Sequence, residues 1–186
     1  MTMKILLIIS GSIAAYKALD LIRKLQENKH TITGIISKSG EKFVTPLSVA
    51  SLSGNYAYTN ADFFNTHNSM HHISLTRNSD LVLVAPATLD IIAKTAYGIA
   101  DELATTILIA SNIPIIMVPA MNPTMWNSKP NQRNINLLKE DNVVIIEPKE
   151  GFALCNEYGL GKMAEIQDIV SFVEGFQKIN TQKKPK

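Results

Sequence analysis

Short apolar runs recur along the chain of 186 residues. They are rich in β-branched residues and do not alternate strictly with polar ones, which is typical of strands covered on both faces of a parallel sheet. The pattern therefore predicts a series of buried parallel strands. The runs are KILLII (residues 4–9), TITGII (31–36), DLVLVA (80–85), IPIIMV (113–118) and NVVIIE (142–147).

The segments between these runs show helical spacing of apolar residues. Asp101 stands where a negative charge favours the start of a helix, and a last helix is predicted over about residues 166–178. Strands that alternate with helices predict an α/β fold, a doubly wound parallel sheet in a three-layer α/β/α arrangement. The two clearest stripes consist of Ala14, Ala18, Leu21 and Leu25, and of Leu103, Ile107 and Ala110.

Composition and charge limit the classes of function that are expected for the protein. Hydrophobic residues make up 46% of the chain and charged residues 18%, which favours one compact domain, expected over residues 1–180, with a disordered basic tail at 181–186. The net charge of +2 does not suggest a nucleic-acid-binding surface. The first apolar run is far shorter than the ~20 residues that span a bilayer. Together with a single cysteine, these features lead us to expect a soluble, cytoplasmic protein.

Ligands of such sheets bind at the carboxyl ends of the strands, so the loops there carry the chemistry. After the first strand, SGSIAAYK places Ser10, Gly11 and Ser12 at a helix start, where free N–H groups favour a phosphate. Ser37 and Ser39 add hydroxyls after the second strand. A G-x-G-x-x-G dinucleotide fingerprint is absent, and an ordinary tight turn is the alternative interpretation.

Two further loops contain candidate catalytic groups. MHHISLTRNSD carries His71 and His72, whose side chains would point to opposite sides of an extended chain, so that only one would face a site. That histidine could be a general base, and the alternative is a pair of exposed loop residues. Clustered metal ligands are absent, so we predict no metal. In PAMNPTMW, Asn122 lies between two prolines and could orient a carboxylate, whereas its apolar neighbours could simply pack in the core.

The single cysteine, Cys155, lies in EGFALCNEYGLGKMAE. An isolated cysteine is most often a buried apolar residue. The segment's three glycines, however, make helix or strand unfavourable and suggest a mobile flap, where a reacting group is often found.

The loops together resemble the homo-oligomeric flavin-containing cysteine decarboxylases. The motifs GSIAAYK, HISL, GIADEL, PAMNPTMW and LCNEYGLGKMAE occur in the family's order, and the resemblance covers about residues 3–170. It implies a flavodoxin-like fold, FMN as cofactor, and a homotrimer or a dodecamer built from trimers. It also implies decarboxylation of 4'-phosphopantothenoylcysteine to 4'-phosphopantetheine in coenzyme A biosynthesis. The substrate would be oxidised by the flavin to a thioaldehyde, lose CO2, and be reduced from the ene-thiol.

The resemblance also assigns roles to residues. His72 would be the catalytic base, with His71 a spectator, and Cys155 would be the acid that finishes the reaction. Asn122 would hold the substrate carboxylate. The remaining substrate contacts would be Met125, Ala153 and Leu154, and the FMN contacts would be Gly11, Ser12, Ile13, Ser37, Ser39, Thr88, Asp90 and Ala120.

Two positions depart from the family pattern. Asp90 stands where the family commonly has Asn, and a carboxylate there would repel a phosphate. Asn156 stands where the family commonly has Gly after the flap cysteine, and asparagine tolerates a left-handed backbone better than most residues, so the turn should survive.

Other functions remain open on these residues. A peptidyl-cysteine decarboxylase of the same superfamily would stop at the ene-thiol, whereas Cys155 favours the complete cycle. A flavin prenyltransferase would not be expected to carry both PAMN and the cysteine flap. A non-catalytic FMN-binding regulatory subunit is disfavoured by the presence of His72, Asn122 and Cys155 in one chain.

Overall fold

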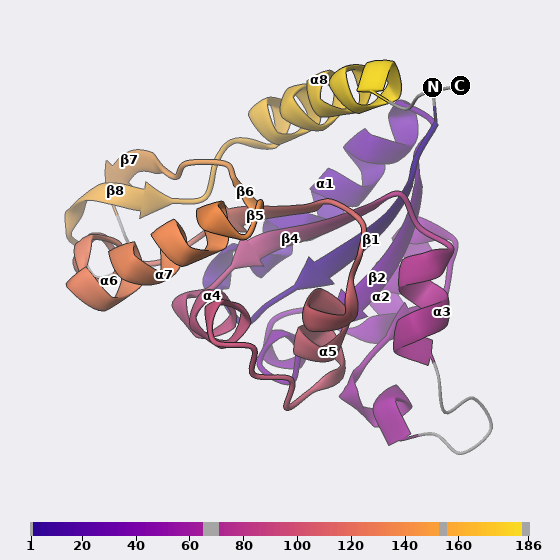
Figure 1. Ribbon diagram of the computed structural model, residues 1–186, viewed down its shortest axis with the longest axis horizontal. Coiled ribbons are helices and arrows are strands. Elements are labelled where there is room, and N and C mark those ends of the chain that lie inside the picture. The colour runs from indigo at the N-terminus through magenta and orange to yellow at the C-terminus, as the bar shows by residue number, and fades with distance from the viewer. Residues whose placement is uncertain (1, 65–70, 153–155, 184–186) are drawn as a thin grey trace.

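The computed structural model describes residues 2–64, 71–152 and 156–183. In this part of the chain, six strands form one parallel sheet in the order β3-β2-β1-β4-β5-β6 (Figure 1). Without the two-residue edge strand β3, this order is that of a flavodoxin-like sheet. The strands are β1 (Lys4–Ile9), β2 (Thr31–Ile36), β3 (Ala57–Tyr58), β4 (Leu81–Ala87), β5 (Ile115–Pro119) and β6 (Val144–Ile145).

Helices cover both faces of the sheet, which confirms the predicted three-layer α/β/α fold (Figure 1). One face carries α1 (Tyr16–Glu27), α2 (Pro46–Ser53) and α8 (Ile166–Lys183). The other carries α3 (His71–Arg77), α4 (Leu89–Ala96), α5 (Leu103–Ala110) and α7 (Lys129–Glu140). No helix in the described part of the chain is long and apolar enough to span a bilayer.

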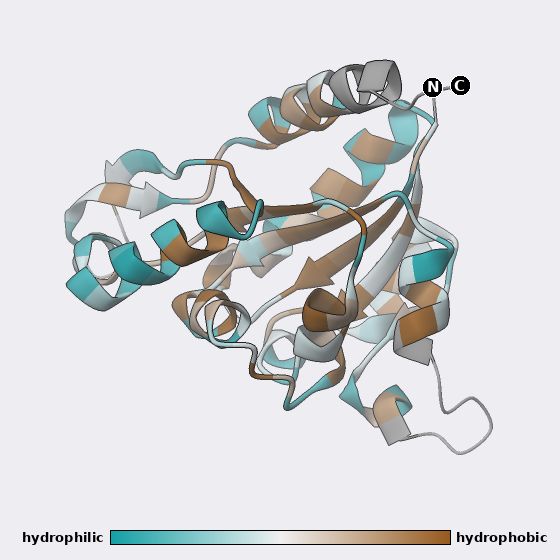
Figure 2. Ribbon diagram, viewed as in Figure 1, coloured by the Kyte–Doolittle hydropathy of each residue, from teal (hydrophilic) through white to brown (hydrophobic). Residues whose placement is uncertain are grey.

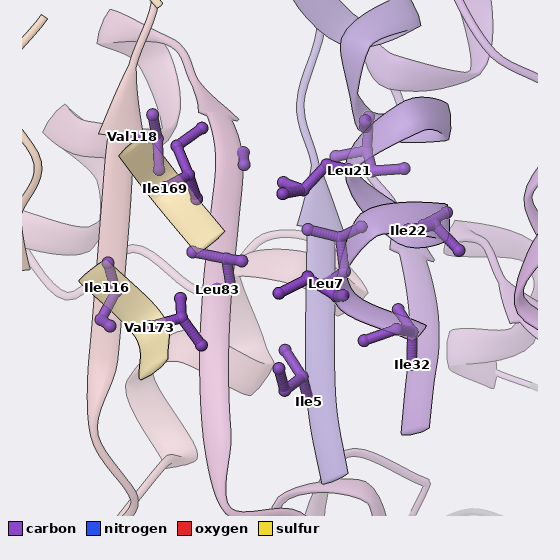
Figure 3. Close-up of a cluster of buried hydrophobic side chains, with 14 of the residues drawn as sticks. Ile5, Leu7, Leu21, Ile22, Ile32, Leu83, Ile116, Val118, Ile169 and Val173 are labelled. Carbon is purple, nitrogen blue, oxygen red and sulfur yellow. The ribbon is translucent and has the colours of Figure 1, made fainter. Parts of the chain in front are cut away.

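The strands are hydrophobic on both faces because each face packs against helices. Figure 2 shows the central strands as predominantly hydrophobic and α7 as largely hydrophilic. All seven residues of β4 are buried. On the face shown in Figure 3, Leu21 of α1 lies beside Leu7 of β1, and Ile169 and Val173 of α8 lie over β4 and β5. This two-sided packing explains why the strand runs do not alternate with polar residues.

Most of the predicted elements occur close to their predicted positions. The strand expected at 142–147 is reduced to β6, and Pro148 beyond it has no N–H to continue the ladder. The last helix extends beyond the expected residue 178 to Lys183. The described part of the chain also has short helical elements: η1 (Ile13–Ala15), η2 (Gly40–Lys42), η3 (Asn60–Phe64) and α6 (Pro123–Asn127).

Two expectations about local conformation are wrong. His71 and His72 begin helix α3 rather than an extended chain, so opposite-facing alternation does not apply to them. The glycine-containing segment after β6, which we expected to avoid regular structure, forms an antiparallel hairpin of β7 (Lys149–Phe152) and β8 (Tyr158–Lys162). The glycines do not prevent strand pairing here. They also let the hairpin approach a neighbouring loop closely.

A buried histidine connects α8 to the edge of the sheet where β1 begins. The Nδ1 atom of His30 accepts the Met3 N–H at 3.1 Å, so in the neutral ring the proton is on Nε2. Nε2 lies 2.6 Å from Glu174 Oε1 and donates to it. The side chain of His30 is fully buried, and Glu174 is therefore the acceptor that satisfies its N–H.

We expect Glu174→Ala to lower the free energy of unfolding by about 1–2 kcal/mol, because it leaves the Nε2–H without its acceptor. Glu174→Gln keeps an acceptor oxygen and should lose less than half as much. Urea unfolding followed by circular dichroism measures both. Lys24→Ala, which breaks an exposed pair with Glu27 on α1, is the control and should cost less than ~0.5 kcal/mol. Equal losses for Glu174→Ala and Lys24→Ala would contradict the assignment.

Candidate functional site

The loops after β1 and β4 are joined by one buried hydroxyl. Ser10 Oγ donates to the Pro86 carbonyl at 2.7 Å and accepts the Thr88 N–H at 3.0 Å. Ser10 is 1% exposed, so these bonds do not compete with water. Ser10 therefore acts inside the rim of the sheet, and the next residues, Gly11 and Ser12, reach its surface.

The loop after β2 packs directly against Gly11. A Cβ placed on Gly11 would lie 2.4 Å from the Cβ of Ser39, so only glycine allows this approach. Ser39 is exposed, whereas Ser37 is buried. Ser37 Oγ accepts the Gly40 N–H at 3.0 Å and lies 3.2 Å from Ser39 Oγ. Ser37 thus braces the loop, and Ser39 presents its hydroxyl beside Gly11.

Two helix-capping hydroxyls complete this rim. Ser12 Oγ accepts the Ala14 N–H at 3.2 Å at the start of η1, and Thr88 Oγ1 accepts the Ile91 N–H at 3.4 Å at the start of α4. Because each oxygen accepts from its own helix, its proton remains available to donate outward. Hydroxyl donors at two helix starts, with glycine between them, suit an anion such as a phosphate.

The carboxylate of Asp90 pairs with a neighbouring lysine, which it shares with Asp101. Lys94 Nζ lies 3.2 Å from Asp90 and 3.1 Å from Asp101. Burial alone would lower the pKa of Lys94, but the hydrogen bonds and charges of both carboxylates outweigh it and raise the pKa. Likewise, burial would raise the pKa of Asp101, and Lys94 reverses this and lowers it. One lysine against two carboxylates offsets the charge of Asp90 only in part, so the expected repulsion of a phosphate is reduced but not removed.

A cavity of about 470 Å³ opens between η1, the loop after β5 and the β7–β8 hairpin. Four residues predicted as ligand contacts line it: Ser12, Ile13, Ala120 and Asn122. The hairpin contributes Gly151, Phe152, Gly159, Gly161 and Lys162.

Gly161 of the β7–β8 hairpin packs against the Met121–Asn122 peptide. The Met121 N–H donates to the Gly161 carbonyl at 3.0 Å. A Cβ on Gly161 would lie 2.3 Å from the Met121 carbonyl oxygen, and Gly161 has a φ of 151°. Both its conformation and its surroundings therefore require glycine. This contact fixes one wall of the cavity against Asn122.

The amide of Asn122 has a determined orientation. Its Oδ1 accepts the Met125 N–H at 2.7 Å and caps helix α6. Because the oxygen is committed to the helix, the NH2 group is the part left to bind a ligand, and it can only donate. Asn122 can therefore bind a carboxylate, as the sequence predicts.

The cavity has a positive lining. Its described lining residues include Lys17 and Lys162 and neither Asp nor Glu. Glu165 lies behind both lysines, 2.7 Å from Lys162 and 3.7 Å from Lys17. The hydrogen bond with Lys162, aided by the charge of Lys17, lowers the pKa of Glu165, and the same bond raises the pKa of Lys162. Two cations against one carboxylate leave a net attraction for anionic ligands. Sequence reasoning missed both lysines, whose positions in GSIAAYK and GLGKMAE were the available signal.

The structure does not bring all the predicted site residues together. Helix α3, which begins with His71 and His72, lies on the opposite side of the molecule from the β7–β8 hairpin (Figure 1). Met125 is 42% exposed on α6. Ala153, Leu154 and Cys155 fall outside the described residues. Asn156, just beyond them, has a φ of 63°, which confirms the expected left-handed backbone. Among the described residues, no group of three or more His, Cys, Asp or Glu side chains is placed to hold a metal.

Comparison with known proteins establishes the family. The Flavoprotein family matches residues 1–178. The chain belongs to this family. A probable phosphopantothenoylcysteine decarboxylase of Streptococcus mutans is 36% identical over 176 residues, which cover 94% of this chain and 98% of that one. The chain spans less than half the length of the first curated relatives that it matches, coenzyme A biosynthesis bifunctional proteins CoaBC, including one from Bacillus subtilis that is 40% identical.

Solved structures of the Flavoprotein type share the fold. A PPC decarboxylase cysteine-to-serine mutant, complexed with pantothenoylaminoethenethiol, has a TM-score of 0.88 and 31% identity and covers 96% of this chain and 100% of that one. The FMN binding protein AtHal3 has a TM-score of 0.84 and 32% identity and covers 95% and 97%.

We expect Gly161→Ala to displace the hairpin from the Met121–Asn122 peptide, because a Cβ cannot fit against the Met121 carbonyl. Amide hydrogen exchange should show at least ~10-fold faster exchange at the Met121 N–H. Gly151→Ala is the matched control, since its Cβ would meet only the flexible Lys162 side chain, at 3.1 Å. Its Met121 exchange should stay within ~3-fold of wild type. Unchanged protection in Gly161→Ala would show that the hairpin does not depend on this contact.

Proposed function

We propose that this protein is an FMN-dependent phosphopantothenoylcysteine decarboxylase, a carbon–carbon lyase of coenzyme A biosynthesis. The observation that carries the proposal is the orientation of the Asn122 amide. Its oxygen caps α6, so its NH2 group is left to donate to a ligand of the cavity that Lys17 and Lys162 also line. The substrate, 4'-phosphopantothenoylcysteine, carries a carboxylate and a phosphate. The Streptococcus mutans relative, matched over nearly its whole length, is named for this activity. The cytoplasm is the expected location of such a metabolic enzyme.

The hydroxyl-rich rim fits the phosphate of FMN. Gly11 allows close approach there, and Ser12, Ser39 and Thr88 supply hydroxyl donors. Lys94, which Asp101 shares, offsets part of the charge of Asp90. Ile13 and Ala120 line the adjoining cavity, and Ser37 supports the rim from inside. The FMN binding protein AtHal3 has the same fold over nearly the whole chain. When bound, FMN would supply the two-electron oxidation and reduction of the substrate.

The chain's own residues would bind the substrate and move protons. The NH2 group of Asn122 holds the carboxylate that leaves as CO2, and Lys17 and Lys162 attract the anionic substrate. His72 accepts a proton in the oxidative half of the cycle. Cys155 donates a proton to carbon in the reductive half. In the solved relative, replacement of a cysteine by serine accompanies a bound pantothenoylaminoethenethiol, which is an ene-thiol of the kind that would persist without this donor.

The separation of α3 from the hairpin supports a homo-oligomer. One copy carries His72 and the hairpin on opposite sides, so the two can meet only if a neighbouring copy brings its α3 to this hairpin (Figure 1). A homotrimer, or a dodecamer of trimers, is the assembly that the family resemblance implies. Each site would then be shared between two subunits.

The proposed activity can be tested with purified protein. A flavin absorption spectrum and release of CO2 from 4'-phosphopantothenoylcysteine, with 4'-phosphopantetheine as product, are expected. Cys155→Ser should still release CO2 but accumulate a product with a pair of hydrogen atoms fewer, which mass spectrometry distinguishes. Full yield of 4'-phosphopantetheine from Cys155→Ser would remove this role from Cys155. A protein that acts only on peptides with a C-terminal cysteine would be a peptidyl-cysteine decarboxylase, and a yellow but inactive protein would be a binding subunit.

Asn122 has two functions that substitutions can separate. Asn122→Asp retains the cap of α6, so its stability should stay within about 0.5 kcal/mol of wild type. It removes the NH2 donors and adds a negative charge, so turnover should fall at least ~100-fold. Asn122→Ala should lose turnover and also about 1 kcal/mol of stability. Urea unfolding and CO2 release measure the two effects. An active Asn122→Asp variant would refute the role in carboxylate binding.

A further inference from the structure

Glu102 is a buried residue that makes a partly buried hydrogen bond to the loop after β2. It lies at the start of α5, is 5% exposed, and accepts the Lys38 N–H through Oε2 at 2.7 Å. The two residues are 64 positions apart in the chain. A carboxylate that accepts a backbone N–H in a buried position forms a stronger bond than a neutral acceptor. This bond therefore links the far-side helix α5 to the rim described above.

The bond acts on the segment that presents Ser39. The neighbouring Ser37 N–H donates to the Ile9 carbonyl at 3.1 Å, and the Gly40 N–H donates to Ser37 Oγ at 3.0 Å. Glu102 accepts the N–H of Lys38, one of the two residues between Ser37 and Gly40. With these three N–H groups held, the position of Ser39 beside Gly11 is determined.

Glu102 is itself held in place. Its N–H donates to Thr105 Oγ1 at 3.2 Å, and the next N–H, of Leu103, donates to Asn60 Oδ1 at 3.2 Å. The start of α5 therefore cannot drift without breaking these bonds. The carboxylate acts from a fixed point on the opposite helix layer.

We propose that Glu102 is a positioning residue of the cofactor site, which holds Ser39 where it can donate to the phosphate of FMN. This inference rests on the proposed FMN site. It predicts that loss of Glu102 weakens recognition of the phosphate more than recognition of the flavin ring.

The test compares FMN with riboflavin, which lacks the phosphate, by fluorescence titration of flavin-free protein. For Glu102→Ala the Kd of FMN should rise at least ~10-fold and that of riboflavin no more than ~3-fold. Glu102→Gln keeps an acceptor and should restore FMN binding to within ~3-fold of wild type. Glu174→Ala removes a carboxylate hydrogen bond to His30 at the other end of the sheet, where β1 begins, and its ratio of FMN to riboflavin affinity should not change.

Several outcomes would overturn the inference. They are an equal loss of affinity for both flavins in Glu102→Ala, an altered affinity ratio in Glu174→Ala, and failure of Glu102→Gln to restore FMN binding. If Glu102→Ala does not fold, Glu102→Asp decides, because it keeps the carboxylate but is one methylene shorter and should lose the bond to the Lys38 N–H. The Kd of FMN should then rise more than that of riboflavin, and equal changes would overturn the inference. Failure of the wild-type protein to bind FMN at all would instead refute the proposed function, so the two failures are distinguishable.

Discussion

The rim of the sheet depends on the hydroxyl of Ser10. Ladder hydrogen bonds hold strands together, but they end where the strands end, and the loops beyond need other partners. Ser10 Oγ donates to the Pro86 carbonyl and accepts the Thr88 N–H, and it is excluded from water. The loops after β1 and β4 therefore keep a fixed separation at the point where the strand order reverses. Such a point is where doubly wound sheets bind their ligands.

The same edge requires glycine at two points where loops approach each other closely. At Gly11 the approaching group is Ser39, and at Gly161 it is the Met121 carbonyl. A side chain at either position would separate a loop from its neighbour. The first contact sets the rim and the second places the hairpin against Asn122, so the proposed phosphate-binding and carboxylate-binding parts of the site both depend on glycine. At these two contacts the polar groups are a short hydroxyl side chain and a backbone carbonyl, which are not long and flexible.

The sequence predicts the elements that depend on local periodicity. It does not predict contacts between segments that are far apart in the chain. Buried strands are recognisable because two-sided burial produces β-branched runs such as KILLII. The cap by Asn122 was not predicted, although asparagine before Pro123 is a local signal for the start of a helix. The bond from Glu102 to Lys38 has no local signal, because its partners are 64 residues apart. The β7–β8 hairpin was missed for a related reason: Gly161 disfavours a strand by itself and becomes favourable only against Met121.

The arrangement of the proposed site also gives a physical reason for assembly. The rim and the cavity lie at the carboxyl edge of the sheet, while α3 and the hairpin lie on opposite sides of the fold (Figure 1). The described part of the hairpin and the start of α3, which carries the proposed base, therefore lie apart within one subunit. In the proposed oligomer, one subunit supplies the flavin rim, Asn122 and the hairpin, and its neighbour supplies His72. Flavin binding would then depend mainly on contacts within a subunit, whereas decarboxylation would also depend on contacts between subunits.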